Sequence, residues 1–92
     1  MSPIFEHRVR FGTIARTVVY EDERGELCFC FDLNPEKNPK TGKWTLFLGR
    51  QASIGSTIVE PVGPQKDRIE AAWEKTKSYL VSCGYEVEED SG

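Results

Sequence analysis

The chain has 92 residues, a formal net charge of −3, 38% hydrophobic residues and 29% charged residues. This length suits one domain, because a single core usually organises about 100–200 residues, and the hydrophobic share excludes a disordered chain. The acidic balance does not favour nucleic-acid binding, and no stretch approaches the roughly 18 apolar residues that cross a bilayer. Residues 1–8 lack the basic segment and apolar run of a secretory leader. We therefore expect one cytoplasmic domain over residues 1–92, with no membrane contact.

Strand-forming residues fill the beginning of the chain. Residues 9–20 are rich in β-branched and aromatic types and predict one strand, with a bulge or bend near Gly12 that reconciles its two alternation phases. Residues 21–25 have the composition of a turn. Residues 27–31 then predict a second strand. We expect the two strands to form an antiparallel hairpin, joined by a loop of three or four residues.

A polar loop and two further strands follow. Residues 34–43 hold two Asn-Pro steps and a glycine, a composition typical of a flexible loop. Residues 44–48 predict a third strand that ends at Gly49. Residues 51–55 read as a connection, and residues 57–60 predict a short fourth strand.

A C-terminal helix is the most clearly marked element. Proline suits the first turn of a helix, so Gly63-Pro64 predicts the start, and Asp67 offers a second start with capping-box spacing. One face of this helix is apolar at helical spacing, and its residues are Ile69, Ala72, Trp73, Thr76, Tyr79, Leu80 and Cys83. Gly84 is a natural stop.

The end of the chain alternates before it becomes acidic. Residues 85–87 predict a last edge strand, and residues 88–92 an acidic tail. The whole pattern predicts an α+β fold, in which a three- or four-stranded antiparallel sheet packs against one C-terminal helix.

Two of the predicted strands are apolar on both faces. Cys28 and Cys30 lie opposite Leu27, Phe29 and Phe31, while Thr45 and Phe47 lie opposite Trp44, Leu46 and Leu48. One amphipathic helix can cover only one face of the sheet. The second face therefore needs a curled sheet, the 34–43 loop or another chain. We predict a non-catalytic binding or regulatory module that acts through a sheet face, as a homodimer or with a partner protein. A self-contained bent sheet and a small-ligand groove are the alternatives.

The cysteines do not indicate catalysis or a metal. Cys28 and Cys30 have a spacing that soft metals use, but a site needs further ligands. The remaining candidates are Cys83, which ends the apolar stripe of the helix and is expected to be buried, and His7, which lies far along the first strand. An odd number of cysteines suits a reducing compartment, with the thiols packed as small hydrophobic groups. We expect no metal, no cofactor and no catalytic residues, and therefore no enzyme.

Basic residues supply an alternative function. The candidate binding residues are Arg8, Arg10 and Arg16 on the first strand, Lys40 and Lys43 on the loop, Trp44 and Phe47 on the third strand, and Arg50 at its end. Cations beside an aromatic ring suit single-stranded nucleic acid, which binds through phosphate contacts and stacking. Solvated side chains that protect a sheet edge are the plainer explanation. Nucleic-acid binding is therefore the second hypothesis.

Overall fold

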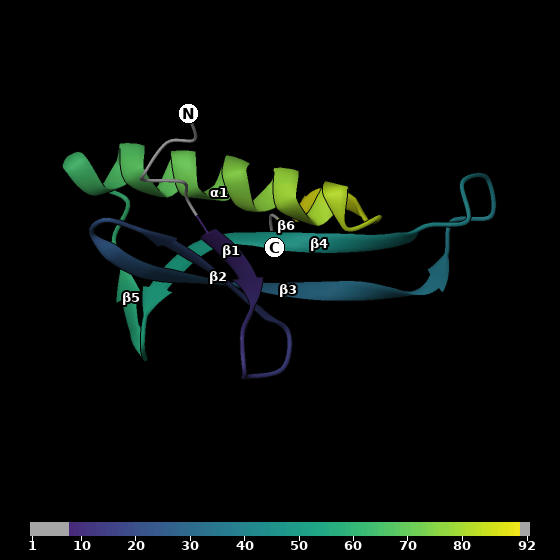
Figure 1. Cartoon of the computed structure of the whole chain (residues 1–92), viewed down its shortest axis with the longest axis horizontal. Helices are drawn as coiled ribbons and strands as arrows, with labels where there is room; N and C mark the ends of the chain where they lie inside the picture. The colour runs from purple at the N-terminus through teal and green to yellow at the C-terminus, as the bar shows by residue number, and fades with distance from the viewer. Residues whose placement is uncertain (1–7, 91–92) are drawn as a thin grey trace, which may run out of the picture.

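The fold is a six-stranded sheet with one helix on one face. The computed structural model describes residues 8–90. Its elements are β1 (Arg8–Phe11), β2 (Thr17–Asp22), β3 (Gly25–Lys37), β4 (Trp44–Ile54), β5 (Thr57–Val59), α1 (Pro64–Ser82) and β6 (Glu86–Asp90). Strands β1 to β5 are antiparallel neighbours in chain order, and β6 runs parallel to β4. Figure 1 shows α1 lying along one face of this sheet. The predicted α+β class with a C-terminal helix is confirmed, with more strands than expected.

The helix begins and ends where the sequence predicts. Gly63 precedes it with φ 60, Pro64 is its first residue, and Gly84 follows it with φ 102. Its buried residues are Ile69, Ala72, Trp73, Thr76 and Leu80. The prediction for Cys83 is wrong, because this residue caps the helix and is exposed.

The segment 9–20 forms two strands and not one. β1 and β2 are joined by residues 12–16, and their register sets Phe11 opposite Val18. A Cβ at Gly12 would collide with Oγ1 of Thr17, so the chain reverses direction at a residue that has no side chain. The reversal places the apolar side chains of both alternation phases on one face of the sheet. The expected bend near Gly12 is therefore a hairpin, and Arg16 lies in its loop.

The hairpin between β2 and β3 is tighter than predicted. Asp22 pairs with Gly25, which leaves a turn of only Glu23 and Arg24. The backbone N–H of Arg24 donates to Asp22 Oδ1 at 2.8 Å, an arrangement that stabilises such a turn.

The predicted loop at 34–43 is shorter in the structure. β3 continues to Lys37, which pairs with Trp44 after an irregularity that follows Leu33. The loop comprises residues 38–43 and is closed by a hydrogen bond from the Asn38 N–H to the Lys43 O at 2.8 Å. Pairing with β4 thus outweighs the turn-forming composition of residues 34–37.

Gly49 does not end the third predicted strand. β4 continues to Ile54, across a bulge at which Phe29 pairs with Ala52 while Phe31 pairs with Leu48. A Cβ on Gly49 would lie 3.2 Å from the Cys30 O, so the glycine permits a close approach of two backbones. β5 then forms within the predicted range.

The acidic end of the chain belongs largely to the sheet. β6 pairs with β4 from Thr45↔Glu86 to Gly49↔Asp90. The predicted tail at 88–92 is therefore a strand as far as Asp90, and its last two residues lie outside the described part. The pairing is parallel because α1 carries the chain back across the sheet between β4 and β6.

The core lies between α1 and the face of the sheet that α1 covers. It contains Val18, Tyr20, Leu27, Phe29, Leu46, Leu48, Ala52, Ile69, Ala72, Trp73 and Leu80. Two polar contacts fix the helix in place. Arg68 Nη2 donates to Asp22 Oδ1 at 2.9 Å, and Trp73 Nε1 donates to the Gly49 O at 3.1 Å. None of the helices within residues 8–90 is long and apolar enough to cross a membrane.

Candidate functional site

The second face of the sheet carries no helix. Arg10 pairs with Val19, Val19 with Cys28, and Cys28 with Ser53, so these side chains share the face opposite the core. We call this surface the helix-free face, made of Arg10, Val19, Glu26, Cys28, Cys30 and Ser53. Figure 1 shows that the β1–β2 loop and the β4–β5 hairpin both project from the sheet on this side.

The chain covers part of this face itself. Val19 is only 6% exposed although no helix lies over it. A Cβ at Gly12 would lie 3.4 Å from Val19, which shows that the β1–β2 loop folds under the sheet there. Phe47 is half-buried, while Cys28 is half-buried and Cys30 is exposed. The bent sheet therefore shields one part of the second face and leaves the middle of β3 accessible.

A hollow of about 400 Å³ lies between the two projections. We call it the loop-side hollow. Its walls include Ile14 of the β1–β2 loop and Gly55 of the β4–β5 turn, and its floor includes Val19 and Cys28. Ile14 is 73% exposed, so the wall formed by the β1–β2 loop carries an apolar side chain at its tip. Ile54, beside Gly55, shares the side of β4 that carries the core residue Ala52 and therefore points away from this hollow.

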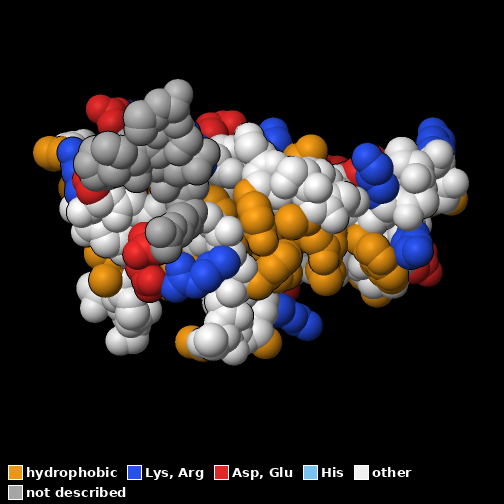
Figure 2. Space-filling view, viewed as in Figure 1, with side chains coloured by type: hydrophobic (Ala, Val, Ile, Leu, Met, Phe, Trp, Pro, Cys, Tyr) orange, Lys and Arg blue, Asp and Glu red, His pale blue; other side chains and the backbone are white. Residues whose placement is uncertain are grey.

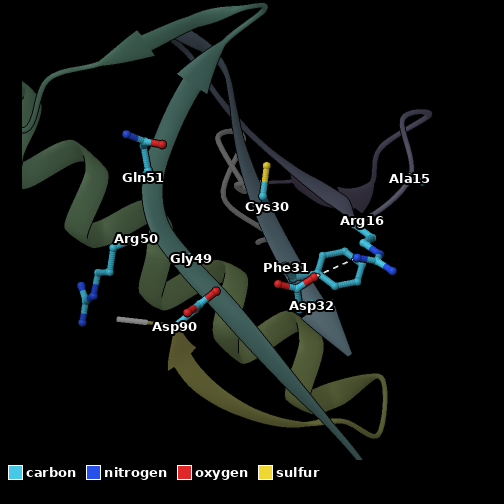
Figure 3. Close-up of a pocket in the computed structure, with 9 residues that line it drawn as sticks. All are labelled: Ala15, Arg16, Cys30, Phe31, Asp32, Gly49, Arg50, Gln51 and Asp90. Carbon is cyan, nitrogen blue, oxygen red and sulfur yellow. Dashed lines mark hydrogen bonds and ion pairs between the residues drawn. The ribbon is translucent and has the colours of Figure 1, made fainter. Parts of the chain in front are cut away.

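A second hollow, of about 640 Å³, lies beside the β-bulge. We call it the bulge-side hollow. Figure 3 shows Cys30 and Asp32 reaching it from β3, Gln51 from β4, and Asp90 from the end of β6. Cys30 also lines the loop-side hollow. The two hollows therefore adjoin each other at Cys30 on the helix-free face, and we call the two together the helix-free groove.

The charges in the groove are paired. Arg10 lies 2.7 Å from Glu26 and 3.8 Å from Glu21, and Arg16 lies 3.1 Å from Asp32. The hydrogen bond from Arg10 to Glu26 raises the pKa of the guanidinium, and the charge of Glu26 adds to the effect. The guanidinium groups of Arg10 and Arg16 in the groove are therefore paired with carboxylates and do not form a strip of unpaired positive charge.

The Cys28 thiol of the groove is not activated. Burial raises the pKa of Cys28 above the ordinary value of a thiol, and the nearby Glu26 and Cys30 raise it further against the opposing charge of Arg10. Such a thiol stays protonated at neutral pH and is a poor nucleophile. Within the described residues no group of three or more His, Cys, Asp or Glu side chains could hold a metal. His7 lies outside those residues.

The structure separates the predicted basic residues. Arg10 and Arg16 lie in the groove, and Arg8 pairs with Glu21 in the β1–β2 ladder. Lys40 and Lys43 lie on the 38–43 loop, at the tip of the β3–β4 arm and beyond the end of β1 (Figure 1). The strand and loop cations therefore do not form one surface.

The remaining predicted residues have mostly structural contacts. Lys37 Nζ lies 5.6 Å from the centre of the Trp44 ring, which is 39% exposed. The Arg50 guanidinium lies 3.9 Å from the centre of the Trp73 ring and 3.2 Å from Glu89. In Figure 3 the Arg50 side chain leaves β4 on the side away from Cys30. Arg50 therefore lines the groove's edge without offering its charge to it.

Sequence reasoning missed the apolar tip of the β1–β2 loop and the polar residues of the groove. Ile14 was assigned to the strand at 9–20, although it lies close to Gly12, where a bulge or bend was predicted. That combination was the available signal for an exposed tip. Comparison of the chain with protein-family models, with curated proteins and with solved structures found no match.

Proposed function

We propose that this chain is a non-catalytic binding module that holds a segment of another protein in the helix-free groove. The observation that supports it is a pair of adjoining hollows, with the exposed side chain of Ile14 on one wall, on the face that α1 leaves uncovered. Concave surfaces with apolar side chains and a few polar groups are where proteins bind ligands. The ion pairs Arg10–Glu26 and Arg16–Asp32 lie along the groove and can align charged groups of the bound segment.

The shape of the face favours a different protein over a second copy. A two-fold dimer places the same patch of both copies in contact. Here the β1–β2 loop and the β4–β5 hairpin both project, so a second copy would set hollow against hollow. A convex segment of another protein fills the space between the walls. Observation of a homodimer that uses this face would therefore correct the proposal.

Protein binding also has more support than nucleic-acid binding. The guanidinium groups of Arg10, Arg16 and Arg50 each contact a carboxylate within the chain. A phosphate would have to displace those carboxylates, which repel it. Lys37, 5.6 Å from the centre of the Trp44 ring, and Lys43, next to Trp44 in the chain, keep the combination of charge and ring that the second hypothesis needs.

The cysteines allow the groove to be tested directly. Cys30 lies in both hollows, whereas Cys83 is exposed at the end of α1 and serves as an internal control. Peptides would be selected from a random displayed library against the full chain, and alkylation by iodoacetamide would be followed by mass spectrometry. With peptide at ten times its Kd, alkylation of Cys30 should slow about tenfold while that of Cys83 is unchanged.

A matched pair of variants completes the test. Ile14→Asp should abolish peptide binding, because Ile14 forms a wall of the groove, whereas Val62→Asp, at 65% exposure and outside the groove, should not. Selected peptides that leave Cys30 unprotected would overturn the proposal. A dimer in sedimentation that Ile14→Asp dissociates would instead identify a second copy as the occupant. Oligonucleotide binding that Lys43→Glu removes would favour the nucleic-acid hypothesis.

A further inference from the structure

Part of β3 has an unpaired edge. β2 pairs with β3 only as far as Thr17↔Cys30, and the last contact is the Phe31 N–H donating to the Arg16 O at 2.9 Å. From there to Lys37, no strand of the described chain pairs with β3 on this side. Backbone groups of alternate residues point to the same side of a strand, so the N–H and C=O of Leu33 point outward like those of Phe31.

Apolar side chains lie along the same edge. Leu33 is 46% exposed and Phe11 is 42% exposed. The Phe11 ring meets those of Phe31, Tyr79 and Tyr85 edge-on, at centroid distances of 5.9, 6.1 and 6.4 Å. We call these five residues the edge patch. Figure 2 shows hydrophobic side chains gathered in the middle of this view.

We propose that this edge binds a short extended segment of another protein as an added antiparallel strand. The added strand would lie end to end with β2. It would exchange two hydrogen bonds with Leu33 and donate a third to the Phe31 C=O. Its alternate side chains would be apolar where they face the edge patch. Those between would be polar, because they face the exposed pair Arg16–Asp32 on the other side.

The backbone groups of the edge favour another protein over a second copy. If two copies paired about Leu33, Phe31 of one would face Pro35 of the other. The Phe31 N–H is already bonded to the Arg16 O, and proline has no N–H to give. Self-pairing would therefore form only the two bonds at Leu33, whereas a strand without proline forms a third. Pro35 thus disfavours pairing of this edge with the same edge of a second copy, and proline commonly has this effect on edge strands.

The test uses a defined probe and does not depend on the groove. The probe is an acetylated, amidated peptide of alternating valine and threonine with a lysine at each end. In the complex, hydrogen exchange of the Leu33 amide should slow, with backbone chemical-shift changes centred on Phe31 and Leu33. Alkylation of Cys30 in the groove should stay unchanged, so failure of this proposal and failure of the groove proposal are distinguishable.

Two variants make the result decisive. Leu33→Pro removes the outward N–H and should weaken binding more than about fivefold, the effect of losing one backbone hydrogen bond and leaving its partner unpaired. Val62→Lys, at an exposed residue away from the edge and outside the groove, should bind as the unchanged chain does. Peptide binding with no change at the Leu33 amide in the unchanged chain would overturn the proposal. So would a dimer that Leu33→Pro dissociates, which would assign the edge to a second copy.

Discussion

Thr76 is a buried polar residue whose replacement should stabilise the fold. It lies on the core-facing side of α1, with its side chain fully buried, and its hydroxyl has no hydrogen-bond partner within the described residues. In the unfolded chain this hydroxyl is hydrated. Folding therefore removes the hydrogen bonds between this hydroxyl and water and does not replace them.

The size of the effect follows from the chemistry of the substitution. Burying an unsatisfied hydroxyl costs about 1–3 kcal/mol. Thr76→Val keeps the shape of the side chain and has a similar helix propensity. The free energy of unfolding should rise by about 1–2 kcal/mol, and Tm by about 4–8 °C for each kcal/mol in a domain of this size.

Urea and thermal unfolding followed by circular dichroism would measure the change. Thr76→Ser is the matched control, because it keeps the hydroxyl and removes a buried methyl group, and it should destabilise the fold by about 1 kcal/mol. A Thr76→Val chain no more stable than the original would refute the reasoning. That result would mean that the hydroxyl bonds to a backbone carbonyl of the preceding helical turn.

Three further changes probe the helix contacts and the buried thiol. Arg68→Met should lower the free energy of unfolding by about 3–5 kcal/mol in urea titrations, because it removes the opposite charge beside the Asp22 carboxylate where both side chains are 7% exposed. Adding Asp22→Asn should recover part of that loss; no recovery would contradict the account. Trp73→Phe removes the hydrogen bond to the Gly49 O and should cost about 1–3 kcal/mol in the same assay, and a loss below about 0.5 kcal/mol would count against it. Burial raises the folded pKa of Cys28 above that of the unfolded chain, so its contribution to stability is present below the unfolded pKa and is lost as pH rises through the folded pKa. Stability measured from pH 8 to 10 should therefore fall less in Cys28→Ser than in the original chain.

The helix could be predicted from the sequence because its signals are local. Pro64 marks the start, Gly84 marks the end, and the buried face repeats every three or four residues. The ends of the strands were harder to predict from the sequence, because they depend on pairing with distant residues. Gly12 and Gly49 illustrate this point. The same residue type lies at a chain reversal in one case and inside a continuous strand in the other, and only the register distinguishes them.

The candidate surface was predicted at the level of the face and not of the residues. Cys28 and Cys30 do lie opposite Leu27 and Phe29, so the sequence pattern located a second face that one helix cannot cover. The sequence pattern did not reveal that Arg10 is paired with a carboxylate, because only strand pairing brings Glu26 within its reach. That contact joins residues 16 apart in sequence and depends on a hairpin that was expected to be a single strand.

The parallel ladder between β4 and β6 has a consequence for the order of folding. Its first pair joins Thr45 to Glu86, so β5 and all of α1 lie in the loop that must close before it forms. The antiparallel hairpins join residues much nearer in sequence and lose less chain entropy when they form. We expect the hairpins to be largely built at the folding transition state and the β6 ladder to form after it. Weakening β6 should then accelerate unfolding and leave the folding rate nearly unchanged, so this strand governs the lifetime of the native state.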